Sequence, residues 1–99
     1  MIGDHHVDYA FVEGGMLNVT RYLACYLAPF NVRVNTLSPG AIETPNLPAS
    51  FIADFSKRTP LGRLAQPWEM QGAALFLASD ASTYVTGQNI VADGGWTSV

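Results

Sequence analysis

The sequence has 99 residues, of which 48% are hydrophobic and 13% are charged. This length allows one small domain at most, and the charged share is about half of the roughly 25% that globular proteins usually carry. We therefore expect either that much of the surface is buried against other protein or that the chain is one piece of a larger body. The net charge of −3, without blocks of like charge, excludes the electrostatic footprint of a nucleic-acid-binding protein.

The N-terminal sequence MIGDHHVDY has neither the basic region nor the apolar stretch of a signal peptide. The most apolar run, residues 16–28, is too short for a membrane span and is interrupted by Asn18 and Arg21. The single cysteine, Cys25, excludes an internal disulfide and fits a reducing compartment. We therefore expect a cytoplasmic protein with no membrane partner.

Apolar periodicity predicts five elements in the order helix, strand, short helix, helix, strand. Residues 1–8 are expected to form a tail, and the first helix is apolar around most of its circumference, which indicates burial on two sides. Pro67 suits the first position of the last helix, because its missing N–H costs nothing there. The predicted ranges are 10–28, 32–37, 49–57, 67–78 and Asn89–Ala92.

Two strands that are joined through helices pair most readily as parallel neighbours. A parallel sheet needs cover on both faces and usually contains more than two strands. The sequence therefore predicts an α/β fold in which this chain supplies part of a larger parallel sheet.

The segment VRVNTLSPGAIET, residues 32–44, joins an apolar run to a loop that contains Pro39, Gly40 and Thr44. In open parallel sheets, ligands bind just beyond the carboxyl ends of the strands. The pattern therefore favours a binding loop at the edge of a cofactor cleft. For a Ser-Pro-Gly triplet taken alone, a plain strand-to-loop turn is the commoner explanation.

This segment and two others, PLGRLAQPWEM and FLASDASTYVTGQNIVADGGW, resemble the C-terminal portion of short-chain dehydrogenases/reductases in both order and spacing. The resemblance covers residues 9–99 and implies the last two strands of a Rossmann-type sheet, with their flanking helices. It also implies the family reaction, which is hydride transfer between NAD or NADP and an alcohol or carbonyl carbon.

The family's catalytic motif, Tyr-x-x-x-Lys, falls on Tyr9 and Glu13, because the Gly-Gly pair that commonly follows the lysine matches Gly14 and Gly15. The i, i+4 spacing places both side chains on one face of a helix. In the family, the lysine lowers the pKa of the tyrosine and holds the nicotinamide ribose. A carboxylate at Glu13 instead disfavours the phenolate, so we expect efficient catalysis to be lost.

The resemblance also assigns cofactor contacts to the Pro-Gly loop. Pro39 would lie against the nicotinamide ring, and Gly40 would allow a close approach because it has no Cβ. Ile42 would offer its main-chain groups to the carboxamide, and Thr44 its hydroxyl to the carboxamide or pyrophosphate. The family's Gly-rich turn and its catalytic Ser and Asn do not occur in this sequence, so we expect the chain to lack the family activity. Binding of NAD or NADP by this chain alone stays open.

Residues 45–59 correspond to the family's variable substrate loop, and two interpretations of its apolar side chains stand equal. They either line a pocket or lid, or they form an amphipathic helix that packs on the body. The side chains concerned are Leu47, Phe51, Ile52 and Phe55.

The resemblance further implies a homo- or hetero-oligomer that is held through residues 10–28, residues 67–78 and a C-terminal tail in which Trp96 and Val99 present apolar surface. One alternative is a non-catalytic relative that associates with an intact dehydrogenase, and another is a remnant without function. We expect no metal site, because adjacent histidines cannot easily share one ion and no further ligands follow at a suitable spacing. The residues that prompt this question are Asp4, His5, His6 and Asp8.

Overall fold

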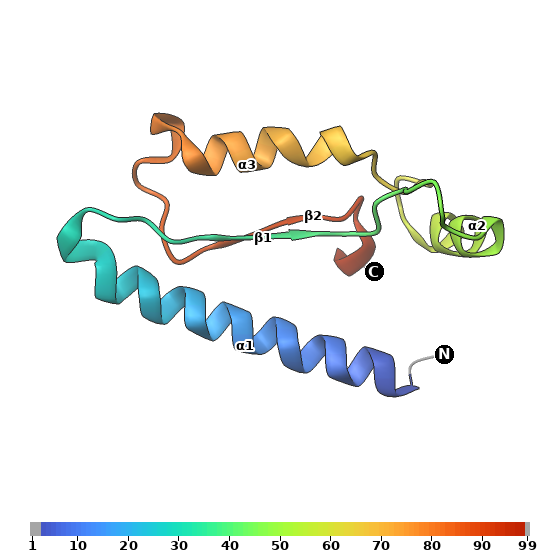
Figure 1. The fold of residues 1–99 in the computed structure, drawn as a ribbon, viewed down its shortest axis with the longest axis horizontal. Helices are drawn as coiled ribbons and strands as arrows, with labels where there is room; N and C mark the ends of the chain where they lie inside the picture. The colour runs from blue at the N-terminus through green and yellow to red at the C-terminus, as the bar shows by residue number, and fades with distance from the viewer. Residues whose placement is uncertain (1–2, 99) are drawn as a thin grey trace. The chain divides into compact units, whose positions relative to one another are not determined.

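The computed structural model describes the backbone of residues 3–98 and the side chains of residues 14–98. The α/β class and the order of elements agree with the prediction. A 3-10 turn over Pro67–Met70 leads into the last helix, so Pro67 does begin a helical segment. The elements are α1 (Gly3–Leu27), β1 (Thr36–Pro39), α2 (Ala49–Arg58), α3 (Gln71–Ala78) and β2 (Asn89–Ala92), as Figure 1 shows.

Strands β1 and β2 are neighbours in a two-stranded parallel sheet (Figure 1). The Thr36 N–H donates to the Gln88 carbonyl at 2.9 Å, and the Gly40 N–H donates to the Ala92 carbonyl at 2.9 Å. Between these two bonds, both strands advance by four residues in the same direction, which is the register of a parallel pair.

Strand β1 begins four residues later than the sequence predicted. The preceding residues are held by one backbone bond, from the Gly87 N–H to the Val34 carbonyl at 2.7 Å, and by side-chain bonds. The Val34 N–H donates to Thr86 Oγ1 at 3.1 Å, and Asn35 Nδ2 donates to the Val85 carbonyl at 2.9 Å. Apolar periodicity does not register such bonds, because they depend on the polar groups of a distant turn.

Helix α1 begins at Gly3, where the sequence predicted a tail over residues 1–8 and a helix start at residue 10. Neither Pro nor Gly interrupts residues 4–13, so nothing in that stretch stops the helix. Among the described side chains of α1, Thr20 and Ala24 are the buried ones, whereas Tyr22 and Tyr26 are 66% and 60% exposed. Much of the described surface of α1 is therefore exposed in this chain, and the expected burial on two sides against other protein stays a prediction.

The described chain falls into two units, one of which joins the residues up to Thr36 with Ser82–Asn89. Polar contacts hold this unit together. The Thr20 hydroxyl donates to the Met16 carbonyl at 2.8 Å, so the Thr36 hydroxyl is the donor in its own bond with Thr20. Arg33 donates to the Ser82 hydroxyl at 2.9 Å, and Ser82 is fully buried.

The second unit joins Leu37–Ala81 with the residues from Ile90 onward, and it contains α2, α3 and the ends of both strands. Its buried residues are Leu64, Thr59 and Ser38. Among the helices that the structure describes, none combines the length and the apolar character that a membrane span needs.

We predict that the 99-residue chain alone unfolds in urea without a cooperative transition. Ala24 and Leu64 are the buried hydrophobic side chains among residues 14–98, and two paired strands are too few for independent stability. Circular dichroism during a urea titration at low protein concentration measures this directly. A sharp sigmoidal curve would contradict the prediction.

Candidate functional site

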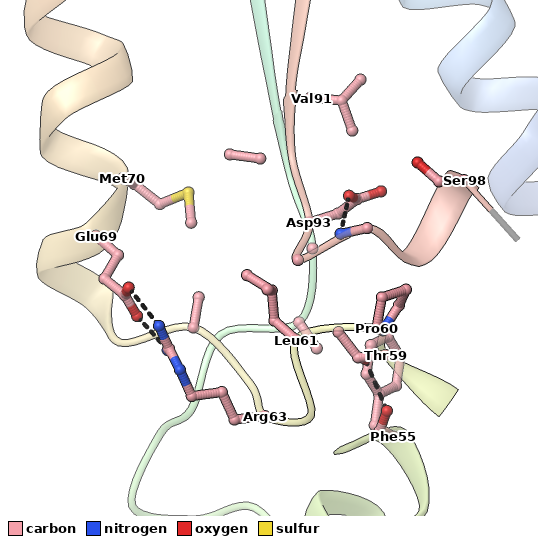
Figure 2. Close-up of a pocket in the computed structure, with 16 residues that line it drawn as sticks. Phe55, Thr59, Pro60, Leu61, Arg63, Glu69, Met70, Val91, Asp93 and Ser98 are labelled. Carbon is pink, nitrogen blue, oxygen red and sulfur yellow. Dashed lines mark hydrogen bonds and ion pairs between the residues drawn. The ribbon is translucent and has the colours of Figure 1, made fainter. Parts of the chain in front are cut away.

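The candidate site lies where β1 and β2 end, in the second unit. A cavity of about 610 Å³ opens there, and Figure 2 shows the side chains around it. Gly40, Ala41 and Asp93 contribute the strand ends, and the residues around Leu61 and Met70 contribute the other walls. This is the edge at which open parallel sheets bind their ligands.

The two strand ends approach each other most closely at Gly40. A Cβ atom built on Gly40 would lie 2.8 Å from the Cα atom and 2.9 Å from the Cβ atom of Asp93. Because the first of these contacts is with backbone, no side-chain rotation relieves it. From the sequence, we expected glycine at this position because a nicotinamide ring would approach it closely. The structure adds a second reason, which is the contact with Asp93 in the same chain.

Beyond Gly40 the chain stays extended because it pairs with Ala65. The Ala65 N–H donates to the Ala41 carbonyl at 3.0 Å, and the Glu43 N–H donates to the Ala65 carbonyl at 2.8 Å, which makes a parallel bridge between Ile42 and Ala65. Successive residues of an extended chain direct their peptide groups to opposite sides. The N–H and C=O of Ile42 therefore point away from Ala65.

Asp93 ends β2 and organises the turn that follows. Its carboxylate accepts bonds from the Gly95 N–H at 3.0 Å, the Thr97 N–H at 3.0 Å and the Thr97 hydroxyl at 2.8 Å. Desolvation alone would raise the pKa of Asp93, but the bonds from Thr97 and Gly95 outweigh it and hold that pKa below its ordinary value. Gly94 and Gly95 adopt φ angles of 66° and 93°, which glycine tolerates best.

Arg63 and Glu69 form a two-bonded ion pair beside the cavity, as the dashed lines in Figure 2 show. The guanidinium nitrogens lie 2.6 and 2.9 Å from the two carboxylate oxygens. Glu69 also accepts the Gln66 N–H at 2.9 Å, at the start of the turn that leads into α3. The hydrogen bond from Arg63 is the main cause that lowers the pKa of Glu69 from 4.5 to about 2, with the Gln66 N–H next.

The charged groups on the cavity wall are thus engaged in bonds within the protein, whereas much of the remaining lining is apolar. Phe55, Leu61, Met70 and Val91 contribute apolar side chains. Such a lining suits the apolar part of a small ligand.

The four residues predicted to contact a cofactor lie on one continuous segment. Pro39 is the last residue of β1, Gly40 lines the cavity, Ile42 forms the bridge with Ala65, and Thr44 is exposed. The structure therefore brings these residues together at one strand end.

The predicted catalytic residues lie elsewhere in the chain. The backbone of Tyr9 and Glu13 lies in α1, but their side chains lie outside the described residues, as do those of Asp4, His5, His6 and Asp8. Among the side chains that are described, no group of three potential metal ligands occurs.

Of the side chains expected in a substrate pocket, the structure places Phe55 on the cavity wall. Phe51 stacks on Phe55 within the same helix, with ring centroids 5.6 Å apart, and the two interpretations of this segment stay predictions. Sequence reasoning missed the pair of Arg63 and Glu69, although an acidic residue in the first turn after Pro67 is a typical helix-start signal. Val99, expected to extend the apolar surface of Trp96, lies outside the described residues.

Comparison with known proteins identifies the class. Residues 1–97 match the sequence model of a family described as enoyl-(acyl carrier protein) reductase. An uncharacterised oxidoreductase of Bacillus subtilis (strain 168), YxbG, is 46% identical over 98 residues, which cover 88% of this chain and 36% of that protein. The chain belongs to the short-chain dehydrogenase/reductase family.

Two further relatives are informative. The cis-4-hydroxycyclohexanecarboxylate dehydrogenase of Sinomonas cyclohexanicum is 43% identical over 95 residues, which cover 93% of this chain and 38% of that enzyme. The crystal structure of a short-chain dehydrogenase from Leptospira borgpetersenii serovar Hardjo-bovis (strain JB197), with bound NAD+, has a TM-score of 0.84 and 46% identity, over 90% of this chain and 35% of that one. The chain thus spans about a third of the length of these relatives.

We predict that Gly40→Ala destabilises the fold, because the new Cβ would overlap the backbone of Asp93. The change is measured in a chimera in which residues 1–97 replace the matching third of the Sinomonas enzyme. We expect the thermal midpoint to fall by roughly 4–8 °C, which corresponds to about 2 kcal/mol of overpacking. The matched control is Gly72→Ala within α3, where no atom lies within 4 Å of the added Cβ. An equal effect of both changes would contradict the prediction.

We also predict that the ion pair of Arg63 and Glu69 stabilises the chimera above about pH 4.5 and loses its effect as the pH falls towards 2. The folded-state pKa of Glu69 lies at about 2, below its value in an unfolded chain, so acid protonates the carboxylate more readily in the unfolded state. Thermal midpoints of the parent and the Glu69→Gln variant should differ at neutral pH and converge near pH 2. A difference that does not depend on pH would show that the charge of Glu69 is not responsible.

Proposed function

We propose that this chain forms the nicotinamide-facing part of an NAD(P)-dependent dehydrogenase/reductase that transfers hydride between an alcohol and a carbonyl carbon. The observation that carries the proposal is the orientation of Ile42, whose peptide groups point away from Ala65 at the end of two parallel strands. The NAD+ in the Leptospira relative supports a dinucleotide as the ligand. When bound, the nicotinamide ring supplies or accepts the hydride.

The residues of this segment match an amide-bearing ring in chemistry. Ile42 offers one N–H donor and one C=O acceptor on the same side of the extended chain, which complement the two groups of a carboxamide. The exposed hydroxyl of Thr44 adds a donor close by. Pro39 contributes a flat apolar surface at the strand end. Because the bonds to Ala65 fix the segment beforehand, little ordering is needed when a ligand binds.

The catalytic step is where this chain departs from the family motif. Tyr9 occupies the tyrosine position and Glu13 the lysine position. A phenol beside a carboxylate keeps its proton at neutral pH, because the like charge disfavours the phenolate. We therefore propose that Glu13 leaves cofactor contact possible through its hydrogen-bonding oxygens and suppresses the proton transfer that hydride chemistry requires.

We predict that Glu13→Lys restores turnover to the Sinomonas chimera. The unsubstituted chimera should oxidise cis-4-hydroxycyclohexanecarboxylate at least roughly 100-fold more slowly than the Glu13→Lys chimera, which is the usual size of a general acid–base contribution. Formation of NADH or NADPH, measured with each cofactor in turn, reports the rate.

Two further variants of the chimera serve as controls for the roles of Glu13 and Thr44. Glu13→Gln removes the negative charge without adding a positive one, so it separates repulsion by the carboxylate from loss of the lysine. Thr44→Ala should raise the KM for the dinucleotide several-fold and leave the stability unchanged. Equal turnover with and without Glu13→Lys would overturn the role given to Glu13. A folded but inactive Glu13→Lys chimera would overturn the proposed function.

A second function, as a non-catalytic subunit that associates with an intact dehydrogenase, is favoured by the apolar side chains that the helices expose. On α1, Met16, Val19 and Tyr22 are each more than half exposed, and on α3 Leu75 is 70% exposed. Contiguous exposed apolar surface often marks a protein interface. Co-elution of the 99-residue chain with an intact relative, without any turnover by the chain itself, would favour this function.

The proposal includes a cytoplasmic location. Its support is Cys25, a free and exposed thiol that suits a reducing compartment better than an oxidising one.

A further inference from the structure

An aromatic stack joins α2 to the turn after β2. The rings of Phe55 and Trp96 lie parallel, with centroids 4.2 Å apart and planes inclined by 12°. The guanidinium of Arg58 lies 5.9 Å from the centroid of the Trp96 ring and is ion-paired with Asp54, one turn earlier on the same helix. Trp96 is therefore contacted by two residues of α2, three positions apart, so that both lie on one helix face.

Backbone contacts beside the stack fit the turn closely against the loop that follows α2. The Leu61 N–H donates to the Gly94 carbonyl at 3.0 Å. A Cβ on Gly94 would lie 2.8 Å from Cγ2 of Thr59, and a Cβ on Gly95 would lie 2.9 Å from Cγ of Pro60. The turn and the loop therefore meet without space for a side chain between them.

Thr59 continues this connection into α2. Its side chain is buried, and its hydroxyl donates to the Phe55 carbonyl at 2.7 Å, as the dashed line in Figure 2 shows. Three successive residues, Thr59, Pro60 and Leu61, therefore connect the end of α2 and the following loop to the turn after β2. Phe55 and Thr59 of α2 and its C-cap, Pro60 and Leu61 of the loop, and Gly94 and Gly95 of the turn all line the cavity.

Phe55 lines the cavity, whereas Trp96 does not. Trp96 thus packs on the ring of a lining residue without itself lining the cavity. We propose that Trp96 is a positioning residue that fixes Phe55 as the apolar wall of the substrate cavity and thereby limits the size of the alcohol or ketone that fits. This inference rests on the proposed function.

The same arrangement indicates which part of a substrate the wall receives. Arg63 is engaged with Glu69, and the Asp93 carboxylate is engaged with Gly95 and Thr97. A charged substrate group would compete with these bonds for the same side chains. The wall formed by Phe55 therefore receives the hydrocarbon part of a secondary alcohol or of the corresponding ketone.

The kinetic test uses the Glu13→Lys chimera, with the Sinomonas enzyme's own alicyclic substrate. We expect Trp96→Ala to raise the KM for that substrate roughly tenfold and to change kcat by less than about twofold, because the change removes ground-state fit and leaves the reacting groups in place. Trp96→Phe should restore the KM, since it keeps a ring against Phe55. Trp68→Ala is the matched control, because that indole is 65% exposed and does not line the cavity.

The double variant Phe55→Ala/Trp96→Ala separates a shared role from two independent ones. If Trp96 acts through Phe55, the double variant should have the KM of Phe55→Ala alone. Additive effects would overturn the proposal, and so would an unchanged KM in Trp96→Ala or a loss confined to kcat.

A second readout needs no catalysis and so distinguishes a failure of this inference from a failure of the proposed function. The two tryptophans of this chain are labelled as 5-fluorotryptophan, and their fluorine resonances are assigned with the Trp68→Phe and Trp96→Phe variants. Phe55→Ala should move the Trp96 resonance, because it removes a stacked ring, and should leave the Trp68 resonance in place. The measurement reports on the stack in the folded chimera whether or not that chimera turns over substrate. A Trp96 resonance that ignores Phe55→Ala overturns the proposal.

Discussion

The close approach of Gly40 to the backbone of Asp93 is the constraint on which the rest of the site depends. Gly40 has no side chain, so the ends of β1 and β2 can lie in close contact there. The segments that follow the two strands therefore begin side by side. One segment becomes extended along Ala65 and turns the peptide groups of Ile42 outward. The other turns at Asp93 and brings Trp96 to α2. A side chain at Gly40 would therefore disturb the binding segment and the cavity wall together.

Electrostatics in this unit serves structure more than ligand recognition. The bond from Arg63 and the Gln66 N–H hold Glu69 ionised and fix the start of the turn that leads into α3. Asp93 is held ionised by bonds from its own turn, in spite of its desolvation. Both carboxylates are engaged in this way, so the cavity between them presents mainly hydrocarbon to a ligand.

The sequence allowed prediction of the elements whose signals are local. The range of β2 and the ends of α2 and α3 follow from apolar spacing and from Pro67, and the turn at Asp93 follows from its two glycines. The start of β1 did not follow, because residues 34 and 35 bond to a turn about fifty residues away. The stack of Phe55 on Trp96 and the reason for Gly40 are likewise non-local. They depend on packing between segments that only the folded chain brings together, so no local pattern reports them.

The proposed binding residues and the proposed catalytic residues belong to different units of this chain. The backbone bonds of the segment from Pro39 to Thr44 with Ala65 and Ala92 lie within one unit. Tyr9 and Glu13 belong to α1, in the other unit. A charge reversal at the lysine position can therefore abolish proton transfer and leave the geometry of the binding segment untouched. For the same reason, a relative that has lost the lysine can keep the strand ends, the cavity and the aromatic stack, since the bonds and contacts described for them join residues of one unit.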